Sequence, residues 1–173
     1  MRFSLRYGLL AMVLAVLAIA GGVAAKKKAT FPVLDGVSPF VRCDVCDAMV
    51  DAAVEFRDEL VANATRDGVK LTEEAVIETS LEHLCNPHTT NGDWLRRLHW
   101  TVDVVANTVT FDFKNAFGRC KRMCWTGADI CEKLMASEDA DDMSGLLYSN
   151  VAGAKIRKAV CSSACRAQRK AHA

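Results

Sequence analysis

Hydrophobic residues recur at intervals of three and four from residue 38 to about residues 63–68, which predicts an amphipathic helix. Ser38 and Pro39 mark its start, because Pro suits the first helical turn and Ser can cap free backbone amides. Charged residues lie largely between the apolar ones: Asp47, Asp51, Glu55, Arg57, Asp58 and Glu59. The apolar face comprises Cys46, Met49, Val50, Ala53, Leu60 and Val61.

A second helix is predicted to begin near Thr72, because Glu73 and Glu74 would complement the helix dipole in its first turn. Asn86 and Pro87 are predicted to end it. The buried stripe of this helix is expected to be Ile77, Leu81, Leu84 and Cys85.

The hydrophobic period then changes to two, which is typical of β-strands. Trp100, Val102 and Val104 alternate with polar residues, and Val109, Phe111 and Phe113 do the same. A turn at residues 105–108 would join the two strands, so we expect a β-hairpin within an otherwise helical chain.

Three further helical segments are predicted towards the end of the chain. The first contains Ala128, Ile130, Cys131 and Leu134, and a short one surrounds Leu146, Leu147 and Tyr148. The last covers residues 151–165 and includes Ala154, Ile156, Ala159, Val160 and Cys161. Residues 167–173 are expected to form a basic, solvated tail with Arg169 and Lys170, and Arg166 beside it is also expected to be solvated.

The first 25 residues have the three parts of a secretory signal peptide. Arg2 and Arg6 precede an uncharged stretch of nineteen residues that ends in Val23, Ala24 and Ala25. We expect cleavage after Ala25, and an uncleaved membrane anchor is the alternative because this length approaches the roughly 20 residues of a membrane span. Residues 26–37 lack helical spacing and are interpreted as a lead-in.

The expected mature part has 148 residues, a length suited to one domain, which we place at residues 38–166. Its 20 Lys and Arg residues nearly balance its 21 Asp and Glu residues. This balance argues against nucleic acid as a partner, because phosphate binding needs a clustered positive surface.

All eight cysteines lie in the expected mature part, and an even number in a secreted chain indicates four disulfides. Spacing alone leaves 105 pairings open. Asn63, Ala64 and Thr65 form an N-glycosylation sequon, which agrees with the secretory pathway. The cysteines are Cys43, Cys46, Cys85, Cys120, Cys124, Cys131, Cys161 and Cys165.

The spacing of Cys43 and Cys46 also permits a thiol-disulfide oxidoreductase site, in which a helix N-terminus stabilises a thiolate. Arg42 would favour the thiolate, but Asp44 and Asp47 oppose it, and no strand-helix-strand pattern surrounds the pair. We therefore expect no catalytic residue and interpret both cysteines as structural.

Zinc binding is a third interpretation, with ligands from Cys43, Cys46, Cys120 and Cys124, or from Cys85 and His88. An oxidising lumen favours disulfides, so we expect no metal and no cofactor. The scattered His83, His88, His99 and His172 are interpreted as surface or hydrogen-bonded residues, and Trp94, Trp100 and Trp125 as packing residues.

The order of these parts resembles the saposin-like proteins, and within them the canopy branch. The resemblance covers residues 38–165 and rests on the Cys43-x-x-Cys46 pair, the hairpin after Cys85 and residues 118–126 leading to Cys131. It implies a disulfide-stapled bundle of about five helices with an inserted β-hairpin. The implied pairs are Cys43 with Cys165, Cys46 with Cys161 and Cys85 with Cys131, which leaves Cys120 and Cys124 as a local fourth pair.

That local pair needs a non-helical turn, because cysteines four residues apart in a helix orient poorly for a disulfide. The bridge implied between Cys43 and Cys165 would close a loop of more than 120 residues.

The canopy resemblance implies a non-enzymatic protein of the secretory pathway, either in the lumen of the endoplasmic reticulum or secreted. Such a protein would assist the folding or trafficking of membrane or secreted client proteins. Resemblance to saposins at large implies instead a secreted protein that binds lipids or membranes.

Overall fold

The structure is a computed structural model that describes residues 33–34, 36–103 and 108–172. The predicted signal peptide, most of the lead-in, Val104 and residues 105–107 lie outside these residues. Among the described residues, the elements in chain order are α2 (Ser38–Asp67), α3 (Glu73–Val76), η1 (Ile77–Leu81), η2 (Asp93–Arg97), β1 (Leu98–Asp103), β2 (Thr108–Phe113), α4 (Arg122–Met135), η3 (Glu138–Ala140), α5 (Met143–Tyr148), α6 (Gly153–Val160) and α7 (Ser162–Ala171).

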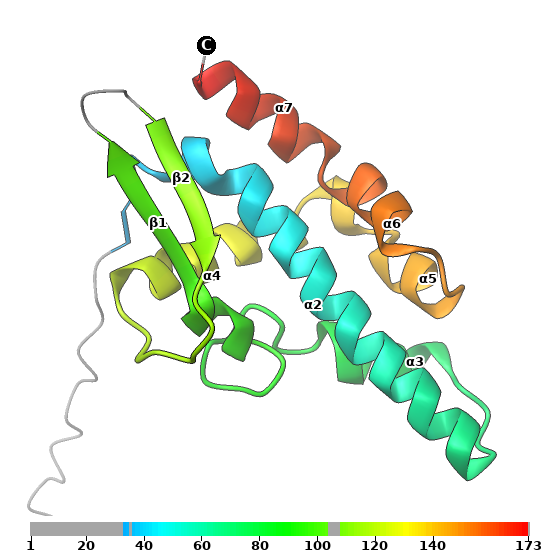
Figure 1. Ribbon diagram of the computed structural model, residues 1–173. Helices are drawn as coiled ribbons and strands as arrows, with labels where there is room; N and C mark the ends of the chain where they lie inside the picture. The colour runs from blue at the N-terminus through cyan, green and yellow to red at the C-terminus, as the bar shows by residue number, and fades with distance from the viewer. Residues whose placement is uncertain (1–32, 35, 104–107, 173) are drawn as a thin grey trace, which may run out of the picture. The chain divides into compact units, whose positions relative to one another are not determined.

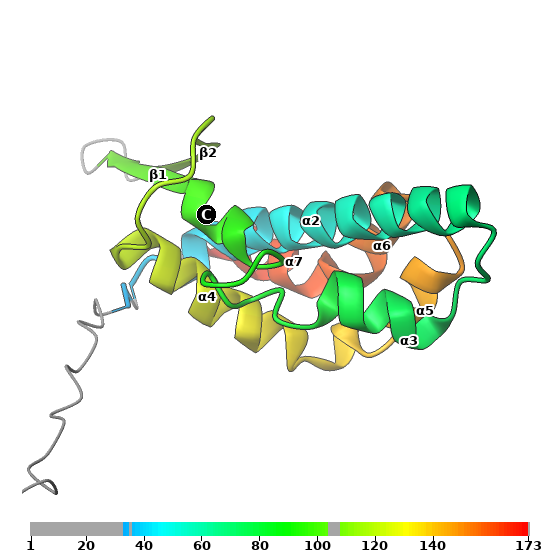
Figure 2. The same cartoon turned by 90° about the horizontal axis from the view of Figure 1, so that it is seen from below.

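Helix α2 lies at the centre, with the hairpin and α4 on one side and α5, α6 and α7 on the other (Figure 1). In the view of Figure 2, α3 and α4 lie on the lower side of α2. The mainly helical class with one antiparallel hairpin is thus confirmed. Within the described residues, no helix is both long enough and apolar enough to span a membrane.

The central position of α2 explains its wide buried surface, which includes Val41, Val45, Met49 and Ala53. Helices pack against α2 from more than one side, so a single narrow apolar stripe would not cover the contacts. Gly68 ends the helix with φ 64°, a left-handed conformation that glycine adopts without steric cost, and it lies at the predicted end of the helix.

Arg57 is the one charged residue of α2 that is almost completely buried, at 4% exposure. Its Nη1 donates to the carbonyl oxygens of Leu147 and Val151, at 3.4 and 3.3 Å, and its Nε donates to the exposed Asp58 at 2.6 Å. The buried guanidinium is therefore paired with a carboxylate and hydrogen-bonded, and it holds α2 to the end of α5 and to the segment after it.

The predicted second helix is shorter than expected. The Thr72 side chain caps its start by accepting from the Ala75 amide, but a π-helical turn, η1, ends it at Leu81. His83 has φ 61°, which takes the chain out of helical geometry before Leu84. The predicted burial of Ile77 is wrong, since Ile77 is 41% exposed and the neighbouring Val76 is buried in its place.

The hairpin has the predicted strands, with Trp100 opposite Phe111 and Val102 opposite Val109. Thr108, which we assigned to the turn, belongs to β2 and pairs with Asp103. Leu98 and Trp100 are buried because β1 packs on α4, whereas residues 101–103 are exposed.

The predicted last helix is two helices, α6 and α7, so the described residues contain six α-helices where about five were expected. The break falls at Cys161, which is bonded to α2 and precedes two serines that compete for backbone hydrogen bonds. Helix α7 continues to Ala171, so residues 167–171, which we assigned to a tail, are helical. Arg166, Arg169 and Lys170 are nevertheless exposed on this helix.

Gly92 provides a test of how closely the segment between η1 and β1 is packed. A Cβ atom at Gly92 would overlap the backbone of Asn86, which no side-chain rotation can relieve. We expect Gly92→Ala to lower the free energy of unfolding by about 1–3 kcal/mol, measured by urea unfolding. Gly145→Ala is the matched control: nothing lies within 4 Å of a Cβ there, so helix propensity should raise stability by about 0.5–1 kcal/mol. Equal effects of the two substitutions would contradict this packing.

Candidate functional site

Four disulfides bind the helices together, and their pairs are those that the family resemblance implies. Cys43–Cys165 and Cys46–Cys161 join the first turns of α2 to the last two helices, with Cα–Cα distances of 4.3 and 5.7 Å. Cys85–Cys131 joins the segment after η1 to α4. The fourth is Cys120–Cys124, and the described residues contain no free cysteine.

The Cys120–Cys124 bridge has the non-helical turn that its spacing requires. Cys120 precedes α4, and Lys121 between them is extended, with φ −115° and ψ −163°. The two Cα atoms are therefore 5.2 Å apart without distorting a helix.

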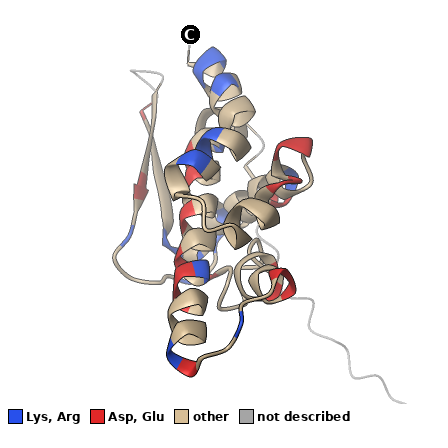
Figure 3. Ribbon diagram, turned by 90° about the vertical axis from the view of Figure 1, so that its right-hand side faces the viewer, with Lys and Arg blue, Asp and Glu red and all other residues tan. Residues whose placement is uncertain are grey.

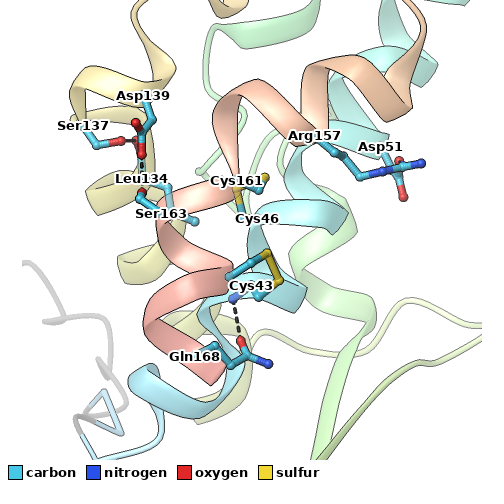
Figure 4. Close-up of a disulfide and its surroundings, with 11 residues drawn as sticks. Cys43, Cys46, Asp51, Leu134, Ser137, Asp139, Arg157, Cys161, Ser163 and Gln168 are labelled. Atoms are coloured by element: carbon cyan, nitrogen blue, oxygen red, sulfur yellow. Dashed lines mark hydrogen bonds and ion pairs between the residues drawn. A yellow bond between two sulfur atoms is a disulfide. The ribbon is translucent and has the colours of Figure 1, made fainter. Parts of the chain in front are cut away.

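The junction between α2 and α7 is held by polar contacts as well as sulfur (Figure 4). The Gln168 side chain accepts from the Cys43 amide and donates to Asp44 at 2.8 Å. Arg157 of α6 pairs with Asp51 of α2. More widely, acidic residues recur along α2 and basic residues along α7 (Figure 3).

Asp47 lies inside this junction and is half-buried. Burial raises the pKa of the Asp47 carboxyl above its ordinary value; Arg157 acts in the opposite direction, and Asp51 and Asp44 add to the increase. An Asp with a raised pKa binds its proton more tightly in the folded chain than in the unfolded chain.

The first two cysteines do not form a bond with one another. Because Cys43 and Cys46 each pair with a distant cysteine, their sulfurs act as crosslinks between helices in this state. Cys43, Asp47 and Cys165 lie close enough to share a cation, but the two sulfur atoms are bonded to each other and offer no thiolate. Every cysteine considered above as a zinc ligand is likewise bonded in a disulfide.

The four histidines lie apart from one another. His88 packs edge-on against Trp125, His172 contacts Phe40, and His83 lies 3.3 Å from Glu82. His99 is the exception to a surface or hydrogen-bonded role, because its buried Nδ1 has no hydrogen-bond partner among the described residues. Trp94 and Trp100 are buried as predicted, and Trp94 donates to the Leu84 carbonyl at 3.0 Å.

Asn63 is exposed near the end of α2, where its side chain accepts from Arg66. The sequon is therefore on the surface, as a glycosylation acceptor must be.

The outer part of the hairpin, residues 101–103 and 108–110, is exposed except for the half-buried Val109. Val102 is 51% exposed and pairs across the strands with the half-buried Val109. The sheet of the described residues has only two strands, so each strand has an outer edge without a neighbouring strand. Such edges and apolar pairs are features of strands that bind other chains.

Comparison with protein-family models, with curated proteins and with solved structures gives no significant match to this chain.

The two bridges at the junction should differ in how fast they are reduced. Cys43 and Cys165 are both half-buried, whereas Cys46 and Cys161 are at most 1% exposed. Because a thiolate must reach a disulfide sulfur to attack it, Cys43–Cys165 should open first under limiting reductant. Alkylation followed by peptide mass spectrometry would measure the order, and earlier loss of Cys46–Cys161 would contradict it.

Asp47→Asn should stabilise the chain in a pH-dependent way. Stability from proton binding to Asp47 is fully present below the unfolded-state pKa of about 4 and is lost as the pH rises through the higher folded-state pKa. The substitution should therefore raise the free energy of unfolding at pH 7 more than at pH 3.5. Urea unfolding at the two pH values tests this, and a gain of the same size at both would show that the raised pKa has no effect on stability.

Proposed function

We propose that this chain is a saposin-like protein of the canopy type that works without catalysis in the secretory pathway. Its role is that of a folding or trafficking cofactor, which binds membrane or secreted client proteins. Four disulfides support an oxidising compartment, and the sequence resemblance supports the choice of family.

The observation that carries the proposal is the hairpin, which extends an exposed pair of strand edges from a helical body closed by disulfides. An extended client segment can add to such an edge through backbone hydrogen bonds, which need no particular client sequence. The apolar pair of Val102 and Val109 would add contact area for client side chains. A chaperone-type module gains from this combination, because it must accept several sequences.

The packing of the helices favours a protein ligand over a lipid. Val45, Met49 and Ile130 are at most 1% exposed, and they belong to one continuous core cluster. A lipid chain entering between these helices would have to separate α2 from α4 and open this buried core.

An oxidoreductase would need Cys43 and Cys46 to cycle between a dithiol and a mutual disulfide. In the observed pairing both bridges to Cys165 and Cys161 would first have to be broken. The structural role therefore accounts better for these cysteines.

Val102→Glu tests whether the hairpin binds clients. It should reduce the polypeptides recovered after mild crosslinking and native purification from the secretory pathway, because a charge would interrupt the apolar pair on an exposed edge. Mass spectrometry of both polypeptides and extracted lipids gives the measurement.

Val69→Glu is the matched control, because Val69 is 64% exposed and lies away from the hairpin in the turn after α2. Unchanged client recovery with Val69→Glu and a loss with Val102→Glu is the expected pattern. Stoichiometric lipid without client polypeptides would overturn the proposal in favour of a lipid carrier.

A further inference from the structure

A pocket of about 410 Å³ lies where the start of β1, the residue after β2 and the start of α4 come together. Five cationic residues line it: Arg96, Lys114, Arg119, Lys121 and Arg122. They come from segments separated by the whole hairpin, which brings residue 96 next to residues 114–122. Blue segments at the base of the hairpin in Figure 3 show part of this grouping.

The cluster has no carboxylate in its lining, although the chain as a whole carries 22 Lys and Arg residues against 21 Asp and Glu residues. The nearest acidic position in the register is the exposed Asp112, which lies across the strands from His99. Like charges held together in this way repel one another, so the site gains stability when an anion binds.

Arg96 of the pocket and its neighbour Arg97, which lies outside the pocket lining, are held in place by nearby groups. Arg96 donates from Nε to the Gly118 carbonyl at 2.9 Å, and its guanidinium carbon lies 5.8 Å from the centre of the Phe117 ring. Arg97 lies 5.8 Å from the same ring and donates from Nε to the Lys114 carbonyl at 3.1 Å. The Nη groups of a guanidinium fixed in this way are preorganised for a carboxylate, which arginine binds through two parallel hydrogen bonds.

The amino end of α4 adds to the positive potential. Its first turn contains no acidic residue, and no side chain caps it. The partial positive charge of a helix start therefore adds to the charges of Lys121 and Arg122 beside it.

The pocket also has apolar surface. Leu98 and Met123 contribute to its lining, and Phe117, which the two arginines contact, is 53% exposed at the base of the hairpin. A ligand that suits this surface carries carboxylates for the cationic residues and apolar groups for the side chains between them. A concave site of this volume accommodates one or two side chains rather than a flat membrane surface.

We propose that this pocket binds an acidic segment of a polypeptide in which carboxylate and apolar side chains alternate. The inference rests on the proposed function, since it names the chemistry by which a client is recognised. The hairpin would then hold the backbone of an extended segment, while the pocket at its base selects for negative charge.

The test uses a synthetic fluorescent peptide of alternating Asp and Leu residues and the full disulfide-bonded chain. Fluorescence anisotropy measures binding, with the Asn and Leu analogue as the uncharged control peptide. The triple variant Arg119→Gln, Lys121→Gln and Arg122→Gln should weaken binding about tenfold, because each partly exposed ion pair contributes a small share of the affinity.

Arg166→Gln, Arg169→Gln and Lys170→Gln together form the matched control, since they remove the same charge from exposed positions on α7. This variant should change the affinity less than twofold. Amide chemical shifts of the unmodified chain provide a second measurement: the acidic peptide should shift residues 114–124 more than residues of α7.

If both triple variants weaken peptide binding equally, the affinity depends on net charge and not on this pocket, and the proposal is overturned. Binding to vesicles of phosphatidylserine, without binding to the peptide, would also overturn it and assign the site to an anionic membrane. If the peptide fails to bind but crosslinked clients are still recovered, this inference fails while the proposed function stands. If no client polypeptide is recovered even with the unmodified chain, the proposed function itself is overturned.

Discussion

The pairing of the first turns of α2 with α6 and α7 is the constraint on which the rest of the domain depends. Cys43–Cys165 spans 122 residues and Cys46–Cys161 spans 115, so these two bridges enclose nearly all of the fold. Closing a loop of this size stabilises the folded state by on the order of 4–5 kcal/mol in chain-entropy estimates, because the unfolded chain loses conformations. The ion pair of Arg157 with Asp51 and the hydrogen bond from Gln168 to Asp44 join the same helices beside these bridges.

With its first turns bonded to the region of α6 and α7, α2 is the central element against which the other helices pack. Farther along α2, Arg57 adds a contact by donating to the carbonyl oxygens of Leu147 in α5 and Val151 after it. Gly127 allows α4 to approach the base of the hairpin, because a side chain there would overlap Leu98. The base of the hairpin is thus fixed against α4.

The sequence predicted the elements whose signals are local. The spacing of apolar residues located α2 and the hairpin, and Thr72 and Gly68 marked helix boundaries that depend only on nearby backbone. It failed where tertiary contacts decide the conformation: the π-helical turn that buries Val76 rather than Ile77, and the break at Cys161. Cysteine spacing alone left the disulfide pairs open, and only the family resemblance specified them.

The basic pocket could not be predicted from composition, because the nearly balanced charge of the whole chain says nothing about where cationic residues cluster. Arg96 and Lys114 come together only through the register of the hairpin, in which Leu98 lies opposite Phe113. The signal that could have located it is the small number of acidic residues between positions 96 and 122, read together with the predicted hairpin.

The position of the Cys43–Cys165 bridge also determines how the domain responds to mechanical force. Tension applied through its two ends would pass from α2 to α7 directly through the covalent bond. The 121 residues between these cysteines, the hairpin among them, would carry no load while that bond is intact. The domain therefore transmits tension between its ends without stretching the hairpin or the core.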